Sequence, residues 1–411
     1  MRGKDENQKT IELQDQERRR RVDSEVRRRE RVSDVTKMGE TPIRKLLISM
    51  SAPAMISMTI NALYNTVDSI FVGMISSKAL TAVSIVQPVQ MLMIALGVGS
   101  AVGVNSLIAR RLGARRLQEA DQAASTAPRI GILNALIFIT VGILFAKPFM
   151  ASYTSDPTIF RYGLSYLRIV TILCGFSMID IQFEKVLQAT GNMMAPMIIS
   201  ISGAVVNIVL DPIFIFGLFG MPRLEVTGAA VATVTGQFVA MTLAILIFFH
   251  KERDVKIKIR GFKIDWSVVK DIYAVGFPSI IMQSIGSIML FGYNKIIAES
   301  AIAVAVLGVY FKLQSFVFMP VFGLNQGAMP IMGFNYGARD SKRLMSTYKN
   351  ALLMALVIMA AGCALFQLIP SGLLHLFSAD EEMLRIGVPA LRLISLCFIP
   401  AAFGIMCSTL F

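Results

Sequence analysis

The chain has 411 residues, of which 55% are hydrophobic and 16% are charged, and its formal net charge at pH 7 is +13. Soluble domains carry about 25% charged residues, so this composition excludes an ordinary soluble protein. The basic residues lie between long apolar blocks, which favours membrane topology over nucleic-acid binding as the reason for the charge.

The first forty residues come before any apolar block and are rich in arginine. Residues 1–40 have too little apolar surface for a core, so we expect a disordered basic tail. Contact with lipid headgroups is the alternative function for this tail. A third interpretation is that translation starts at Met38.

The apolar blocks that follow are long enough to cross a bilayer. Ile130–Phe149, Ala229–Phe249 and Ala351–Ile369 each provide the roughly 20 residues that one transmembrane helix needs. Backbone groups in lipid must be satisfied within their own segment, so each block is predicted to be a helix. Ten helices are predicted, over residues 43–73, 79–109, 124–148, 159–183, 192–219, 226–250, 268–297, 303–335, 345–369 and 384–408.

The loops between these helices alternate in charge. Arginine and lysine gather in the loops over residues 110–116, 251–263 and 339–343, whereas the loop at residues 380–382 is acidic. The positive-inside rule therefore predicts that the amino terminus and the basic loops are cytoplasmic.

An internal repeat relates the two halves of the chain. Gly113-Ala114-Arg115 recurs as Gly337-Ala338-Arg339, an offset of 224 residues. The same offset relates Gly99 to Gly323, Gly103 to Gly327, Arg161 to Arg385, Gly163 to Gly387 and Leu167-Arg168 to Leu391-Arg392. The repeated unit holds six helices, and an even number gives two lobes of parallel topology.

This repeat predicts the domain organisation. We expect a first lobe of six helices over residues 41–250, a cytoplasmic linker over 251–270 and a second lobe over 271–411. Only four helices of the second lobe fall within 411 residues, so the sequence predicts an intact protein of twelve helices that is cut after the tenth.

Glycines and prolines inside the helices have a structural and a functional interpretation. Gly99-xxx-Gly103 and its repeat Gly323-xxx-Gly327 indicate close helix packing, because no strand comes before them as in a dinucleotide loop. Prolines inside helices give static curvature or a hinge for alternating access. They are Pro53, Pro88, Pro212, Pro278, Pro320 and Pro330.

Carboxylates inside apolar helices are the strongest indication of function, because a charge in the bilayer is costly. Asn61, Asn65 and Asp68 share one face of the first helix, and Asn207 and Asp211 lie four residues apart on the fifth. From a rise of ~1.5 Å per residue, we expect Asp68, Asp211 and Thr233 at one depth. Two close carboxylates need a shared proton or a cation, and their oxygen-only neighbours suit Na⁺ or H⁺. A structural hydrogen-bond network is the alternative.

Other polar residues inside the helices are candidates for a substrate cavity. Asp180 is expected to lie too deep to join Asp68 and Asp211, and the alternative to a cavity role is that of a structural carboxylate at the membrane interface. The second lobe lacks the acids of the first and offers polar groups whose alternative role is interhelical packing. The cavity candidates are Gln283, Gln314, Asn325, Gln326, Lys312 and Asp180.

Several of these segments resemble the multidrug and toxic compound extrusion (MATE) transporters, in their bacterial MepA-like branch. The resemblance is carried by Pro53, residues 61–73, the loop Gly113-Ala114-Arg115, residues 188–192 and residues 207–212. It implies an all-α membrane protein with two six-helix lobes around a V-shaped cavity. It implies export of cationic, often aromatic drugs in exchange for Na⁺ or H⁺, with a cation pocket at Asp68, Asn207 and Asp211 and a contribution from Thr233.

The resemblance also implies how this protein works in its cell. We expect a multi-pass protein of the bacterial inner membrane that is not an enzyme and needs no cofactor beyond its coupling ion. Its expected partners are small cationic substrates and the lipid bilayer, and not nucleic acid. It is expected to function as a monomer. A flippase for lipid-linked precursors is the alternative; it needs cationic cavity residues, and Lys312 is the main interior candidate in the sequence. An intramembrane enzyme is a second rival, but no paired metal ligands and no pattern of a nucleophile with its base support it in this sequence.

Overall fold

The structure is a computed structural model that describes residues 38–251, 255–258, 265–297, 301–375 and 381–409. The tail predicted over residues 1–40 therefore lies outside the described residues except for its last three. The first half forms α2 (Ile43–Ile75), α3 (Ser77–Gly113), α4 (Leu117–Tyr153), α5 (Pro157–Ile172), α6 (Gly175–Ala189), α7 (Met194–Phe216), the short η1 (Leu218–Gly220) and α8 (Val226–Lys251). The second half forms α9 (Trp266–Ile297), α10 (Ala301–Gly337), α11 (Ser341–Leu368), α12 (Pro370–His375), α13 (Glu381–Ser395) and α14 (Phe398–Cys407).

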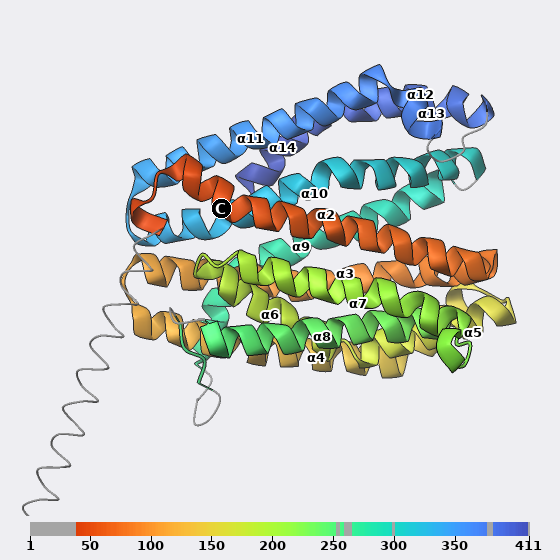
Figure 1. The fold of residues 1–411 in the computed structure, drawn as a ribbon, viewed down its shortest axis with the longest axis horizontal. Helices are drawn as coiled ribbons and strands as arrows, with labels where there is room; N and C mark the ends of the chain where they lie inside the picture. Colours follow the sequence, from red (N-terminus) through yellow and green to blue (C-terminus); the bar gives the residue numbers. More distant parts are fainter. Residues whose placement is uncertain (1–37, 252–254, 259–264, 298–300, 376–380, 410–411) are drawn as a thin grey trace, which may run out of the picture.

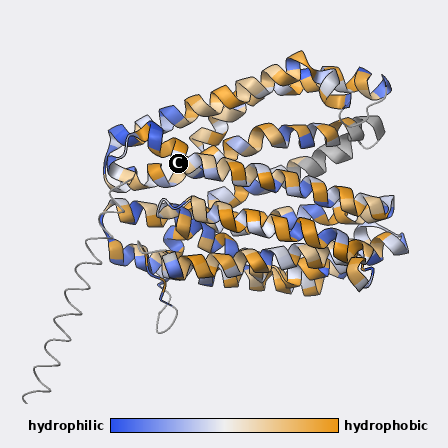
Figure 2. Cartoon of the chain, viewed as in Figure 1, coloured by the Kyte–Doolittle hydropathy of each residue, from blue (hydrophilic) through white to orange (hydrophobic). Residues whose placement is uncertain are grey.

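The helices lie side by side in one elongated bundle (Figure 1). Among the described residues, seven helices are long and apolar enough to cross a membrane, and counting each bent pair as one span raises this to nine. α9 occupies the remaining predicted segment, and it does not meet this measure when only its described residues are considered. Apolar side chains such as Leu144 (60% exposed) and Val357 (62% exposed) point outward along the bundle, and Figure 2 shows apolar residues over most of its length. An apolar exterior of this extent fits a lipid environment.

Two predicted helices are each broken into two in the structure. Residues 159–183 were expected as one helix, but α5 and α6 meet at 46°, and α13 and α14 likewise meet at 42°. At the end of the helix before each break, a hydroxyl bonds back to its own helix: Thr171 Oγ to Leu167 O at 2.7 Å, and Ser395 Oγ to Arg392 O at 2.9 Å. Such bonds compete with the backbone ladder and bend helices.

The breaks themselves follow the internal repeat. Thr171 and Ser395 are separated by the 224-residue offset, and α5 and α13 begin at positions with the same separation. The repeat therefore extends from sequence motifs to the bend of a helix.

The two lobes meet through their first two helices. α3 packs against α9 and α10 packs against α2, which is the same contact made once from each lobe, and α3 packs against α10 between them. A Cβ on Gly103 would overlap the carbonyl oxygen of Ile272 on α9, and a Cβ on Gly327 would overlap Ser51 on α2. Both predicted glycine pairs are thus confirmed as sites of close helix packing.

The loops after α3 and α10 have the same conformation. Arg115 and Arg339 both have φ of 59°, the left-handed conformation that commonly closes a helix. The backbone N–H groups of Ala114, Arg115 and Arg116 bond to residues 110, 112 and 111, and those of Ala338, Arg339 and Asp340 bond to residues 334, 336 and 335. We call the end of the bundle that carries these two loops the basic end.

Candidate functional site

The candidate site begins on α7, where Asn207 and Asp211 lie one turn apart. Asp211 is completely buried and Asn207 is 2% exposed. With its amide placed so that both atoms meet complementary partners, Asn207 donates to Asp211 Oδ2 at 3.2 Å and accepts from the Thr233 backbone N–H at 3.1 Å. The amide therefore holds the Asp211 carboxylate toward α8.

Close packing of α7 on α8 makes this contact possible. A Cβ on Gly236 would lie 2.7 Å from the Gly203 carbonyl oxygen, so small residues are needed where the two helices approach. Gly217, with φ of 75°, ends α7 and turns the chain toward α8. Thr233 on α8 then lies beside Asn207, with its Oγ 3.4 Å from the end of the Asn207 side-chain amide.

Asp68 on α2 completes the group from a third helix. α2 packs against α7, and the Asp68 and Asp211 carboxyl groups lie within hydrogen-bonding reach of each other. The Oδ1 atom of Asp68 is buried and has no hydrogen-bond partner among the described residues. A buried polar atom without a partner is costly and indicates a missing ligand, proton or water.

Two tyrosines beside this group were not singled out in the sequence. Tyr64 on α2 and Tyr166 on α5 both lie within the electrostatic reach of Asp68 and Asp211. The Tyr166 hydroxyl accepts a hydrogen bond from Gln90 on α3 at 3.5 Å. Tyr64 precedes Asp68 by four residues, and this spacing is the one signal that could have identified it.

The arrangement is suited to a small hard cation or a proton. The atoms that it offers as ligands are carboxylate, amide and hydroxyl oxygens, which Na⁺ prefers. Two carboxylates in one buried site cannot both be ionised without a compensating positive charge. Among the described residues, no group of three or more histidine, cysteine or acidic side chains is placed to hold a metal ion.

The remaining predicted ligands lie differently. Asn65 is exposed and its amide donates to the Asn61 carbonyl of its own helix at 2.8 Å. Asn61 thus contributes its backbone oxygen to that bond. The structure brings together Asp68, Asn207, Asp211 and Thr233, and it places the Asn65 amide outside this group.

The predicted cavity residues fall into two sets. Gln283 and Lys312 are exposed and Gln314 is half-buried. Asn325 donates to the Ile405 carbonyl on α14 at 2.8 Å, and Gln326 accepts from Lys185 Nζ at 2.7 Å. For Asn325 and Gln326, the structure favours the alternative of interhelical packing.

A charged group on α6 was largely missed by the sequence analysis. Lys185 is 5% exposed and donates to Gln188 and Gln326, both at 2.7 Å. On the same helix, Asp180 has a buried Oδ1 without a partner among the described residues, and Glu184, directly before Lys185, accepts from Ser200 at 2.8 Å. Lys185 is thus a buried cation that joins α6 to α10 of the other lobe.

A buried hydrogen-bond network also went unrecognised. Asn134 on α4 and Gln182 on α6 donate to Ser100 on α3 at 2.9 and 3.0 Å. Tyr273 on α9 donates to Asn134 at 3.2 Å, so the network crosses between the lobes. Single amides and hydroxyls in apolar helices have no periodic pattern that would have indicated it.

Comparisons with known proteins show which family the chain resembles. The MatE family model matches residues 53–213 and 274–411. The multidrug export protein MepA of Staphylococcus haemolyticus is 24% identical over 86% of this chain and 77% of its own length, and that of Staphylococcus aureus strain MSSA476 is 26% identical over 86% and 78%. A solved structure described as the outward-facing conformation of a multidrug resistance MATE family transporter is 29% identical, covers 92% of this chain and 84% of its own, and superimposes with a TM-score of 0.85.

Proposed function

The chain belongs to the MatE family of multidrug efflux transporters, and we propose that it is an antiporter that exports cationic, often aromatic compounds in exchange for Na⁺ or H⁺. The observation that carries this proposal is the pair of carboxylates, Asp68 and Asp211, held together within the membrane-spanning helices. Charged groups at that depth mark ion or proton pathways far more often than packing.

We assign a separate role to each of the four residues that the structure brings together. Asp68 and Asp211 bind the cation or share the proton, Asn207 orients Asp211, and Thr233 supplies a further oxygen. The unpartnered Asp68 Oδ1 supports this assignment, because a bound cation or proton would satisfy it.

The helix contacts support a route from ion binding to lobe movement. Asp68 lies on α2, which packs on α7 of its own lobe and on α10 of the other. Binding between Asp68 and Asp211 draws α2 and α7 together, and α2 then changes its contact with α10. A drug that prefers the opposite lobe arrangement would be coupled to the ion by linkage.

The orientation follows from charge. We place the basic end in the cytoplasm of a bacterial cell, with the protein in the plasma membrane as a monomer. The relatives that support drug export are described as multidrug export proteins, which does not favour a lipid-linked precursor flippase.

Ethidium accumulation in bacterial cells without their own drug pumps tests the proposal. Cells that express the chain should hold less dye than cells with an empty vector, and collapse of the ion gradient should remove the difference. Equal dye levels, with the protein present in the membrane fraction, would refute multidrug export for this substrate.

A further inference from the structure

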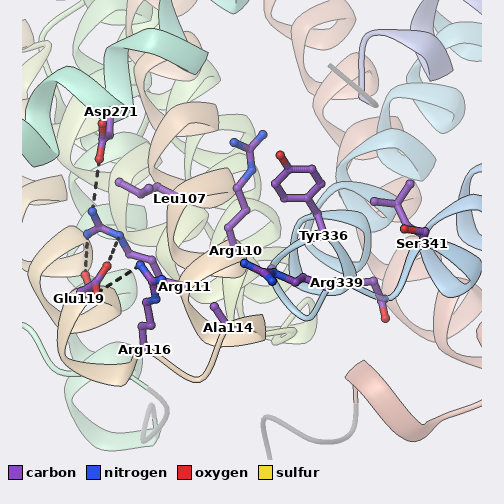
Figure 3. A pocket seen from close by; sticks show the side chains of 13 residues that line it. Leu107, Arg110, Arg111, Ala114, Arg116, Glu119, Asp271, Tyr336, Arg339 and Ser341 are labelled. Atoms are coloured by element: carbon purple, nitrogen blue, oxygen red, sulfur yellow. Dashed lines mark hydrogen bonds and ion pairs between the residues drawn. The ribbon is translucent and has the colours of Figure 1, made fainter.

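A cavity at the basic end has no role in the proposed ion site. It has a volume of about 610 Å³ and lies where α3 meets α10 and the loops that follow them. Its residues come from both lobes (Figure 3). They include four arginines and two acids, namely Arg110, Arg111, Arg116, Arg339, Glu119 and Asp271.

The two acids are already engaged by one of these arginines. Arg111 lies 3.6 Å from Glu119 and 3.5 Å from Asp271, and it also donates to the Glu119 carbonyl at 2.8 Å. Arg116 makes a longer contact of 3.7 Å with the same Glu119. The cavity therefore keeps an excess of positive charge.

Arg110 and Arg339 provide this excess from opposite lobes. Neither forms an ion pair with an acid within the part of the chain that the structure describes. The Arg110 guanidinium stacks on the Tyr336 ring, with its Cζ atom 5.0 Å from the ring centroid. Stacking uses the face of a guanidinium and leaves the N–H groups at its edge available for a ligand.

The side chain of Arg339 reaches from its loop toward α3, where Arg110 and Arg111 lie (Figure 3). Its backbone, with φ of 59°, closes α10 and sets the direction of this side chain. Both arginines line the same cavity, so their positive charges repel each other there unless an anion compensates them. The planar donors of arginine match the oxygens of a phosphate group in pairs.

We propose that this cavity binds a phosphate group between Arg110 and Arg339. The group belongs either to an anionic lipid headgroup or to a free phosphate compound, since both present the same oxygens. Basic pockets between membrane helices are typical sites for anionic headgroups. A phosphate held by both lobes stabilises the arrangement in which the basic ends of α3 and α10 are in contact.

The test measures thermal unfolding of the full chain in nanodiscs. Phosphatidylcholine nanodiscs serve as the reference, phosphatidylglycerol nanodiscs present the lipid phosphate, and inorganic pyrophosphate added to phosphatidylcholine nanodiscs presents the free one. We expect the Tm of the wild type to rise with the concentration of one of these anions until the rise saturates. The arm that responds identifies the source of the phosphate.

Arg339→Gln and Arg110→Gln should weaken the apparent affinity for that anion by roughly tenfold, because each loses charge-assisted hydrogen bonds. Arg115→Gln is the matched control, since Arg115 has the same φ of 59° in the twin loop but does not line the cavity. Arg339 is exposed, so its variant should fold even if the Arg110 variant does not, which circular dichroism checks.

No response of the wild type to either anion would overturn the proposal. It would equally be overturned if Arg339→Gln responded like the wild type, or if Arg115→Gln lost the response to the same degree. The measurement needs no transport, so its result is independent of the proposed export.

Discussion

Gly113 and Gly337 hold equivalent positions on α3 and α10, and each packs against the backbone of the other helix. A Cβ on Gly113 would overlap the Phe334 carbonyl oxygen, and a Cβ on Gly337 would overlap the Arg110 carbonyl oxygen. Residues 334 and 110 are themselves related by the 224-residue offset. The glycines that identified the repeat in the sequence are therefore the points where its two copies touch at the basic end.

Gly337→Ala should force these helix ends apart. Neither backbone can move aside locally, so we expect a loss of about 1–3 kcal/mol in the stability of the arrangement in which α3 and α10 are in contact. Thermal unfolding in detergent checks the loss. The control is Gly286→Ala on α9, where a Cβ would meet none of the described residues within 4 Å; an equal fall in both variants would contradict a specific contact between α3 and α10.

Thr233→Val tests the hydroxyl in the ion site. Valine keeps the shape but removes one oxygen, worth about 0.5–1.5 kcal/mol. The concentration of Na⁺ or H⁺ that gives half-maximal dye export should rise roughly three- to tenfold.

The matched control for this variant lies two residues along α8. Thr235 makes the same kind of bond to its own helix, to the Val231 carbonyl at 2.7 Å, and its side chain is not among the ion-site contacts. Thr235→Val should leave the ion dependence unchanged, and an equal shift in both variants would remove Thr233 from the site.

The bond between Lys185 and Gln326 should couple the two lobes energetically. A charged, buried hydrogen bond predicts an interaction energy of about 1–3 kcal/mol in a double-mutant cycle. Gln326→Leu should therefore lower the free energy of unfolding more in the wild type than in the Lys185→Met background. Additive losses in the cycle would show that this bond does not hold α6 to α10.

The contacts of Asp156, which lies at the opposite end of the bundle from the basic end, predict that the stability of the protein depends on pH. Its carboxylate accepts from Lys78 at 2.7 Å and from the N–H groups of Thr158 and Ile159. The Lys78 bond is the largest cause that holds the pKa of Asp156 below its usual value, and the bonds from Ile159 and Thr158 add to it. A lowered pKa in the folded state stabilises the protein above the unfolded value of about 3.9, and this stabilisation is lost as the pH falls through the folded value.

Asp156→Asn should accordingly have a lower Tm than the wild type at pH 7, because it retains a helix cap but not the charge. Asp156→Ala should be lower still, since it loses the cap as well. The difference between wild type and Asp156→Asn should shrink as the pH approaches 3. A difference that stays constant from pH 7 to pH 3 would contradict the proposed role of the Asp156 charge.

The sequence predicted the parts of this protein that depend on local pattern. Apolar length identified the helices, and the offset between Gly113 and Gly337 identified the repeat. Asn207 and Asp211 were found because their spacing of four residues on one apolar helix is itself the signal.

The rest depended on contacts between distant segments. Nothing in the local sequence distinguishes Lys185 from other lysines in helices, and it becomes buried against Gln326 because α10 of the other lobe approaches it. The break between α5 and α6 lies beside a Thr171 hydroxyl that bonds its own backbone, but most residues that make this bond leave a helix continuous, so the residue type alone does not predict a break. The cavity between Arg110 and Arg339 requires the two lobes to be placed together.

The central proposal is most directly tested by ion-driven ethidium export in proteoliposomes with the chain and its Asp211→Asn variant. Glu382→Gln, a change at an exposed acid outside the site, is the control, and equal incorporation into the liposomes is required. We predict that an imposed Na⁺ or H⁺ gradient drives export by the wild type and the control, and that the variant folds but loses gradient-driven export. Export by Asp211→Asn at the wild-type rate would contradict the assignment of Asp68 and Asp211 as the coupling site.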